Sequence, residues 1–142
     1  MKINKRKQRG ATLITWMIVA GFGILSASAV IKVAPYYMEF QNVKKMMNSI
    51  AASPNVKSAN LRQINSKIEK YLDVNSLYSL EKSYYASKRN RTVTNPFTIV
   101  RLKKGNNRKK LTVKYDVPQP WIGNLSFLIN FKYSVVLGEP KK

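Results

Sequence analysis

Hydrophobic positions along this chain follow a helical pattern in the first half and a strand pattern in the second. The most extreme stretch is residues 11–31, a run of 21 residues without a charge. A helix of that length reaches about 32 Å, which is enough to cross a bilayer core of about 30 Å. We therefore predict a transmembrane helix over residues 11–32.

Helical spacing continues after this span. Apolar residues over 40–50 recur on one helix face, so the helix is expected to continue through a kink at Pro35 and to end near Ala52. A second amphipathic helix is expected over residues 58–72, with Ser58 as its N-cap. Both apolar faces predict packing against a core.

The stretch 73–95 is ambiguous. Its apolar residues between 77 and 85 are compatible with a short strand, and Lys88-Arg89-Asn90-Arg91 is typical of a basic loop. No internal repeat is visible on either side of it.

After Pro96 the apolar residues alternate with polar ones, which predicts β-strands. We expect Pro118 and Pro120 to end the middle strand, and Gly123-Asn124 to form the turn before the longest strand. The expected strands cover residues 97–102, 111–117 and 125–135, with a loop over 103–110.

These elements predict an α+β fold. It consists of an N-terminal transmembrane helix extending into an amphipathic helix, a second helix, and a small antiparallel sheet of three to four strands. The expected organisation is a basic cytoplasmic leader at 1–10, the span at 11–32, and one periplasmic α+β domain at 33–142.

Charge sets the expected orientation. The leader carries five of the 26 Lys and Arg residues and no acid, so the positive-inside rule places it in the cytoplasm and the domain outside. A secretory signal cleaved near Ala29 is the alternative, but the apolar run is longer than the usual signal core of about 7–15 residues. We therefore expect a retained single-pass anchor in a bacterial inner membrane.

Composition limits the chemistry. The chain has no His and no Cys, which removes the commonest general base, the usual metal ligands and the thiol nucleophile. Its six acids are scattered singly, and no phosphate-binding glycine loop is present. Ser28 and Lys32 lie four residues apart on one helix face and are the sole candidates for a hydrolytic dyad. We predict no enzymatic activity, no cofactor and no metal.

The net charge of +20 favours anionic partners, such as anionic lipid or DNA. The densest basic segment outside the leader lies at the expected hairpin tip, where the alternative interpretation is a turn that resists aggregation. The predicted anion contacts are Arg101, Lys103, Lys104, Arg108, Lys109, Lys110 and Lys114.

Small residues in the span predict contact with another transmembrane helix. The candidate contact positions are Gly21, Gly23 and Ala27. A lone anchor that contacts lipid is the simpler interpretation.

The start of the chain resembles the class III leader of type IV pilins and pseudopilins. Arg9-Gly10 is followed by the apolar run from Ala11 to Val19, and the resemblance implies cleavage between Gly10 and Ala11 by a prepilin peptidase. Most of those proteins carry Glu at the position of Thr15. That difference argues against a pilin-like role.

A second resemblance covers nearly the whole chain. The Val-Ala-Pro-Tyr-Tyr-Met-Glu-Phe exit at 33–40, the segment 113–118, and Gly123-Asn124-Leu125 follow in an order similar to the bacterial domain-of-unknown-function family 4845. This resemblance implies a small single-pass envelope protein and supplies no catalytic residues.

Two functional hypotheses remain. The first is a non-enzymatic, inner-membrane-anchored protein whose periplasmic domain binds or scaffolds another envelope component. The second is a minor pilin or pseudopilin, cleaved after Gly10 and used by a type IV pilus or type II secretion machine, with DNA or another polyanion as a ligand. The expected partners are membrane lipid, envelope proteins, and either further copies of the chain or pilus machinery.

Overall fold

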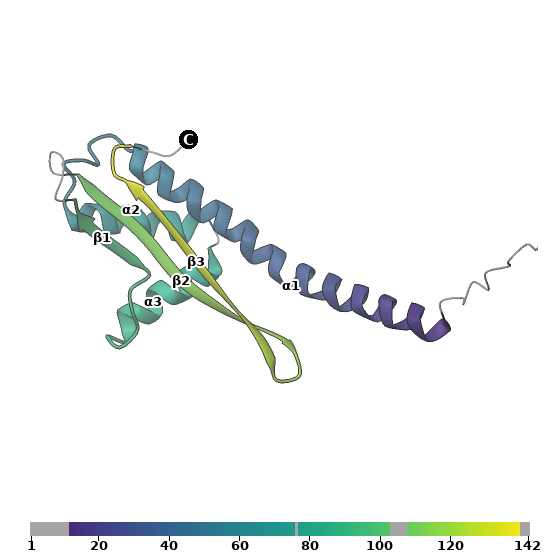
Figure 1. Cartoon of the computed structure of the whole chain (residues 1–142). Helices are drawn as coiled ribbons and strands as arrows, with labels where there is room; N and C mark the ends of the chain where they lie inside the picture. Colours follow the sequence, from purple (N-terminus) through teal and green to yellow (C-terminus); the bar gives the residue numbers. More distant parts are fainter. Residues whose placement is uncertain (1–11, 76, 103–107, 140–142) are drawn as a thin grey trace, which may run out of the picture.

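The computed structural model describes residues 12–75, 77–102 and 108–139, and its dominant element is a single helix, α1 (Leu13–Ala52). This helix of 40 residues runs through Pro35 without ending, and its expected end at Ala52 is confirmed. Its N-terminal half projects from the protein, whereas its C-terminal half packs in the core (Figure 1). Of the described helices, α1 alone is long and apolar enough to cross a membrane.

Helix α2 (Leu61–Val74) has its N-cap two residues later than the expected cap at Ser58. Its N-cap is Asn60, which forms a capping box with Gln63 through two hydrogen bonds of 2.9 Å. The Ser58 hydroxyl instead donates to the carbonyl of Asn55 at 3.0 Å. The prediction of Ser58 as the cap was therefore wrong, because its hydroxyl is used inside the preceding turn.

The ambiguous segment, whose apolar residues were compatible with a short strand, is a helix, α3 (Tyr78–Arg89). Lys88 and Arg89, expected in a basic loop, form its last turn, which corrects that prediction. Its inward face buries Leu80 and Tyr84. The cause lies outside the segment, because the carboxylate that caps the start of α3 belongs to Glu39 of α1.

Three antiparallel strands complete the α+β fold, in the order β1-β2-β3. They are β1 (Phe97–Arg101), β2 (Lys109–Ile122) and β3 (Leu125–Val136). With 14 residues, β2 is longer than β3 with 12, so the third strand is not the longest as expected. Alternate residues of β2 from Leu111 to Val117 point into the core.

Strand β2 continues through Pro118 and Pro120, which were expected to end it. The N–H of Lys114 donates to the carbonyl of Pro96 on the β1 side, at 2.8 Å. N–H groups at every second position of a strand point the same way, so both prolines lack a donor only on that side. Strand β1 starts at Phe97, opposite Val113, and leaves this edge of β2 without a partner strand. The prolines therefore remove no hydrogen bond of the sheet.

The β2–β3 hairpin extends beyond α2 and α3, toward the side of the domain from which α1 projects (Figure 1). Its turn is Gly123-Asn124, as expected, and Gly123 has φ +54°, which suits a tight turn of the type II′ class. Near the tip, the ammonium of Lys32 donates to the carbonyls of Pro120 at 3.3 Å and Trp121 at 3.1 Å. These bonds thus hold the hairpin against α1 at the end of the apolar run of α1.

Candidate functional site

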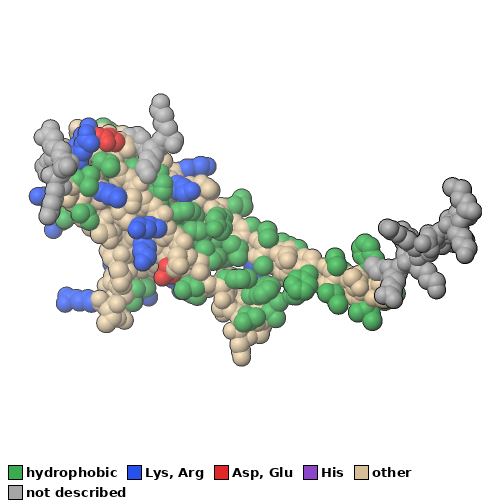
Figure 2. All heavy atoms as spheres, viewed as in Figure 1, with side chains coloured by type: hydrophobic (Ala, Val, Ile, Leu, Met, Phe, Trp, Pro, Cys, Tyr) green, Lys and Arg blue, Asp and Glu red, His purple; other side chains and the backbone are tan. Residues whose placement is uncertain are grey.

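The predicted anion contacts differ in exposure and in bonding partners among the described residues. Arg101 is exposed at the end of β1, and Lys110 is half-buried on β2. Arg108 forms an ion pair of 3.0 Å with Glu139, so part of its charge is neutralised. Lys103 and Lys104 lie outside the described residues. Lys and Arg side chains are spread over the domain, whereas apolar side chains follow the projecting half of α1 (Figure 2).

Lys109 lies in β2 and not in the expected loop, which corrects its predicted place. Its side chain points inward and is 7% exposed. The ammonium donates to the carbonyls of Ala59 at 2.5 Å and Lys57 at 3.4 Å. This lysine fastens the α1–α2 connection to the sheet, and a buried ammonium with protein acceptors offers little to an external anion.

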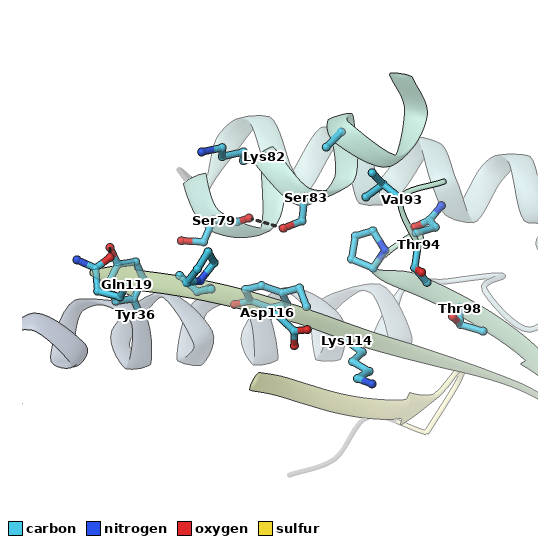
Figure 3. Close-up of a pocket in the computed structure, with 16 residues that line it drawn as sticks. Tyr36, Ser79, Lys82, Ser83, Val93, Thr94, Thr98, Lys114, Asp116 and Gln119 are labelled. Carbon is cyan, nitrogen blue, oxygen red and sulfur yellow. Dashed lines mark hydrogen bonds between the residues drawn. The ribbon is translucent and has the colours of Figure 1, made fainter. Parts of the chain in front are cut away.

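A groove of about 740 Å³ lies between α3 and the unpaired edge of β2. Figure 3 shows Ser79, Lys82 and Ser83 on the α3 side, opposite Asp116 and Gln119 of β2. The residues that line the groove are Tyr36, Ser79, Lys82, Ser83, Ala86, Val93, Thr94, Asn95, Pro96, Thr98, Lys114, Tyr115, Asp116, Val117, Pro118 and Gln119.

The start of α3 gives this groove a fixed wall. Glu39 accepts hydrogen bonds from the Ser79 N–H and hydroxyl, both at 2.8 Å, and a longer one from the Leu80 N–H at 3.4 Å. At the same end of the groove, the Tyr36 hydroxyl donates to the Gln119 side chain at 2.6 Å (Figure 3). Long-range bonds from α1 therefore hold both α3 and β2 in place.

One of the residues that line the groove has a buried hydroxyl group. The Tyr115 hydroxyl has no hydrogen-bond partner among the described residues. Burial, and secondarily the negative charge of Glu39, raise the pKa of Tyr115 above its usual value. The phenol therefore stays protonated and is a donor for an acceptor that reaches it.

The carboxylates of the described residues are mostly occupied by structural bonds. Besides Glu39, Glu69 accepts from Tyr84 at 2.9 Å and from Lys88, and Asp116 accepts from Asn130 at 2.6 Å. Lys88 and Tyr84 lower the pKa of Glu69, which keeps this carboxylate ionised. Within the described ranges, no three His, Cys, Asp or Glu side chains gather as a metal site would require.

The candidate dyad in the span has a different arrangement. Lys32 donates to two hairpin carbonyls and so ties the hairpin to α1. Nothing lies within 4 Å of a Cβ built at Gly21 or Gly23, which leaves both open to another helix. Ala27 is exposed beside them. The predicted cleavage site, Gly10 and Ala11, lies outside the described residues.

Sequence reasoning missed most of the groove. Ser79, Lys82 and Ser83 face it only because the segment is a helix, and the sequence pattern had left the segment ambiguous. The spacing of Leu77, Leu80 and Tyr84 by three and four residues was the signal that indicates a helix there. Of the predicted anion contacts, Lys114 lines the groove.

Comparison with known proteins identifies one family. The family described as a domain of unknown function (DUF4845) matches residues 32–95, which confirms the resemblance to that family over this part of the chain. The match covers the second half of α1, both other helices and the connection to β1. No curated protein and no solved structure matches the chain.

Proposed function

We propose that this chain, which carries a DUF4845 domain of unknown function at residues 32–95, is a non-enzymatic adaptor anchored in the bacterial inner membrane. Its leader lies in the cytoplasm and its domain in the periplasm, where the groove binds a segment of another envelope protein. The observation that carries this proposal is the dual role of α1, an exposed apolar helix at one end and a core helix at the other.

The two halves of α1 support a rigid connection between membrane and domain. Val43, Met47 and Ile50 are completely buried in the core, on the same helix that begins at Leu13. The domain could move relative to the span only if this helix broke or if its buried residues left the core. A helix rises 1.5 Å per residue, so Tyr36 lies about 6 Å beyond Lys32 along α1. The groove therefore opens close to the membrane surface.

The groove's chemistry favours binding over catalysis. Its described lining offers hydroxyl groups, two lysines and one carboxylate, and that carboxylate is engaged by Asn130. The edge of β2 presents carbonyl groups, but Pro118 and Pro120 cannot donate. An added β-strand would find few donors, which favours a ligand segment held by side chains, with Tyr115 as a buried donor.

Orientation is tested by thiol labelling, because the chain has no Cys. We expect Ser66→Cys, exposed on α2, to react with a membrane-impermeant maleimide in intact spheroplasts. Gln8→Cys in the leader should react only after lysis. The opposite pattern would overturn the orientation, and labelling of a fully soluble protein would overturn the anchor.

The groove is tested by placing a photo-crosslinking amino acid at Ser83, in native membranes, and at Asn65 as the matched control. Asn65 is exposed on α2, away from the groove. A discrete adduct with one envelope protein from position 83, and none from position 65, is expected. Equal adducts from both positions, or none from either, would contradict the assignment of the groove.

The continuous helix also favours a second candidate function, the pilin-like subunit. A projecting apolar half followed by a half packed on a small sheet suits a subunit that assembles through its helix. The N-terminal mass of the protein from native membranes separates the two functions. A chain beginning at methylated Ala11 supports the pilin-like function, and a chain that retains the leader supports the permanent anchor.

A further inference from the structure

The β2–β3 hairpin tip has a composition unlike the rest of the domain. Residues 117–131 carry no charge between Asp116 and Lys132, in a chain whose residues are 23% charged. This is the longest uncharged run after the span. A hairpin tip surrounded by water would be expected to carry polar side chains.

Apolar side chains at this tip are exposed. The exposed fractions are 46% for Ile122, 62% for Leu125 and 64% for Leu128. Behind them, the Trp121 and Phe127 rings pack together with their centroids 5.1 Å apart. Clustered apolar exposure of this kind marks an interaction site, and Trp is enriched where proteins meet the membrane interface.

Contacts along β2 show where the tip lies. Going along β2, the bonded partners move toward the N-terminus of α1, from Tyr36 opposite Gln119 to Lys32 opposite Pro120 and Trp121. Lys32 is the first charged residue after the apolar run 11–31. A strand rises about 3.3 Å per residue, so the turn beyond Trp121 reaches past Lys32 to the level of the apolar run.

We infer that the hairpin tip, residues 121–128, inserts into the interface of the lipid bilayer that α1 crosses, on the side where the domain lies. Ile122, Leu125 and Leu128 enter the acyl-chain boundary, and the Lys32 ammonium stays at the headgroup level, where it donates to the carbonyls of Pro120 and Trp121. This inference depends on the proposed membrane anchor. It deepens that proposal, because two points of attachment fix the tilt of the domain and the direction in which the groove opens.

The experiment uses the two Trp residues of the chain, Trp16 and Trp121. In full-length protein with Trp16→Phe, reconstituted in phosphatidylcholine–phosphatidylglycerol vesicles, Trp121 is the sole indole. Acyl chains brominated near the headgroup should quench its emission more strongly than chains brominated near their ends. Unchanged Trp121 emission with every brominated lipid would overturn the inference, as would a blue shift without such quenching, because that indicates protein contact.

The complementary variant Trp121→Phe reports on the span through Trp16. Quenching of Trp16 without quenching of Trp121 refutes the inserted tip and leaves the anchor intact. If brominated lipid quenches neither Trp16 nor Trp121, the anchor itself is refuted.

A third comparison tests the side chains. In the Trp16→Phe background, replacing Ile122, Leu125 and Leu128 by Ser should reduce the quenching of Trp121. The matched control replaces two residues on other elements by Ser, namely Leu61, which is 55% exposed, and Val100, which is 51% exposed. This control should leave the quenching of Trp121 unchanged. Equal quenching in the tip variant and the parent would overturn the role of the apolar tip.

Discussion

The cap that Glu39 supplies to α3 gives a stringent test of the fold. Glu39 of α1 accepts from the N–H groups of Ser79 and Leu80 and from the Ser79 hydroxyl. The N-cap residue of α3, Leu77, forms no side-chain cap of its own. Replacing Glu39 therefore removes the only side-chain cap that the described residues give this helix.

The magnitude follows from the bonds that are lost. Removing an N-cap acceptor costs about 1 kcal/mol, and a negative charge at a helix N-terminus contributes about 0.3–1 kcal/mol. Since a hydrogen bond to a charged group is worth about 1.5–3 kcal/mol, we expect Glu39→Ala to lower the free energy of unfolding by about 2 kcal/mol. Glu39→Gln keeps one acceptor oxygen without the charge, and should cost about 1 kcal/mol.

The assay is guanidinium unfolding of the full chain in detergent micelles, followed by near-UV circular dichroism. A loss of about 2 kcal/mol corresponds to a Tm lower by roughly 8–16 °C in a domain of this size. The control Asp116→Asn removes an exposed negative charge on β2 but keeps a side-chain oxygen that can accept from Asn130, and should change stability by less than about 0.5 kcal/mol. If Glu39→Ala changes stability no more than this control, the capping argument is refuted.

Three further outcomes are expected. Gly138 has φ +88°, so Gly138→Ala should lower the free energy of unfolding by about 1–2 kcal/mol in the same titration; no change would contradict the strain. Burial and the Glu69 carboxylate raise the pKa of Tyr84 to about 12, so stability should fall as pH rises from about 10, where the unfolded phenol ionises, through 12. Tyr84→Phe should flatten this alkaline slope of unfolding free energy, and an unchanged slope would show that Tyr84 does not cause it. Replacing Pro118 and Pro120 by Val restores donors to the free edge of β2, and should promote self-association measured by light scattering, which a charged Lys pair should prevent.

The elements that sequence predicted well have local causes. The span follows from length and apolar composition, and the end of α1 near Ala52 follows from the turn residues behind it. The inward residues of β2 and β3 follow from alternation, which also applies to Lys109, two positions before Leu111. The alternation could have predicted that Lys109 is buried. This was missed because the strand was expected to begin at Leu111.

The missed elements depend on distant partners. Helix α3 contains Ser and Tyr residues with weak helical preference, and its cap comes from Glu39, 40 positions earlier than Ser79. Strand β2 passes through two prolines because β1 is too short to reach them. Neither condition can be read from the segment itself, and the groove exists only where both are met.

By itself, the sequence determined the apolar N-terminal helix that is long enough to cross a membrane, the α+β class and the absence of His and Cys, because these depend on composition and on periodicity within single segments. Tertiary structure decided which polar groups meet. It buried Lys109 under the α1–α2 connection, turned Lys32 from a candidate catalytic group into a tie to the hairpin, and opened the groove between α3 and β2. Such pairings join residues 40 to 89 positions apart, and their geometry is set only when the core has packed.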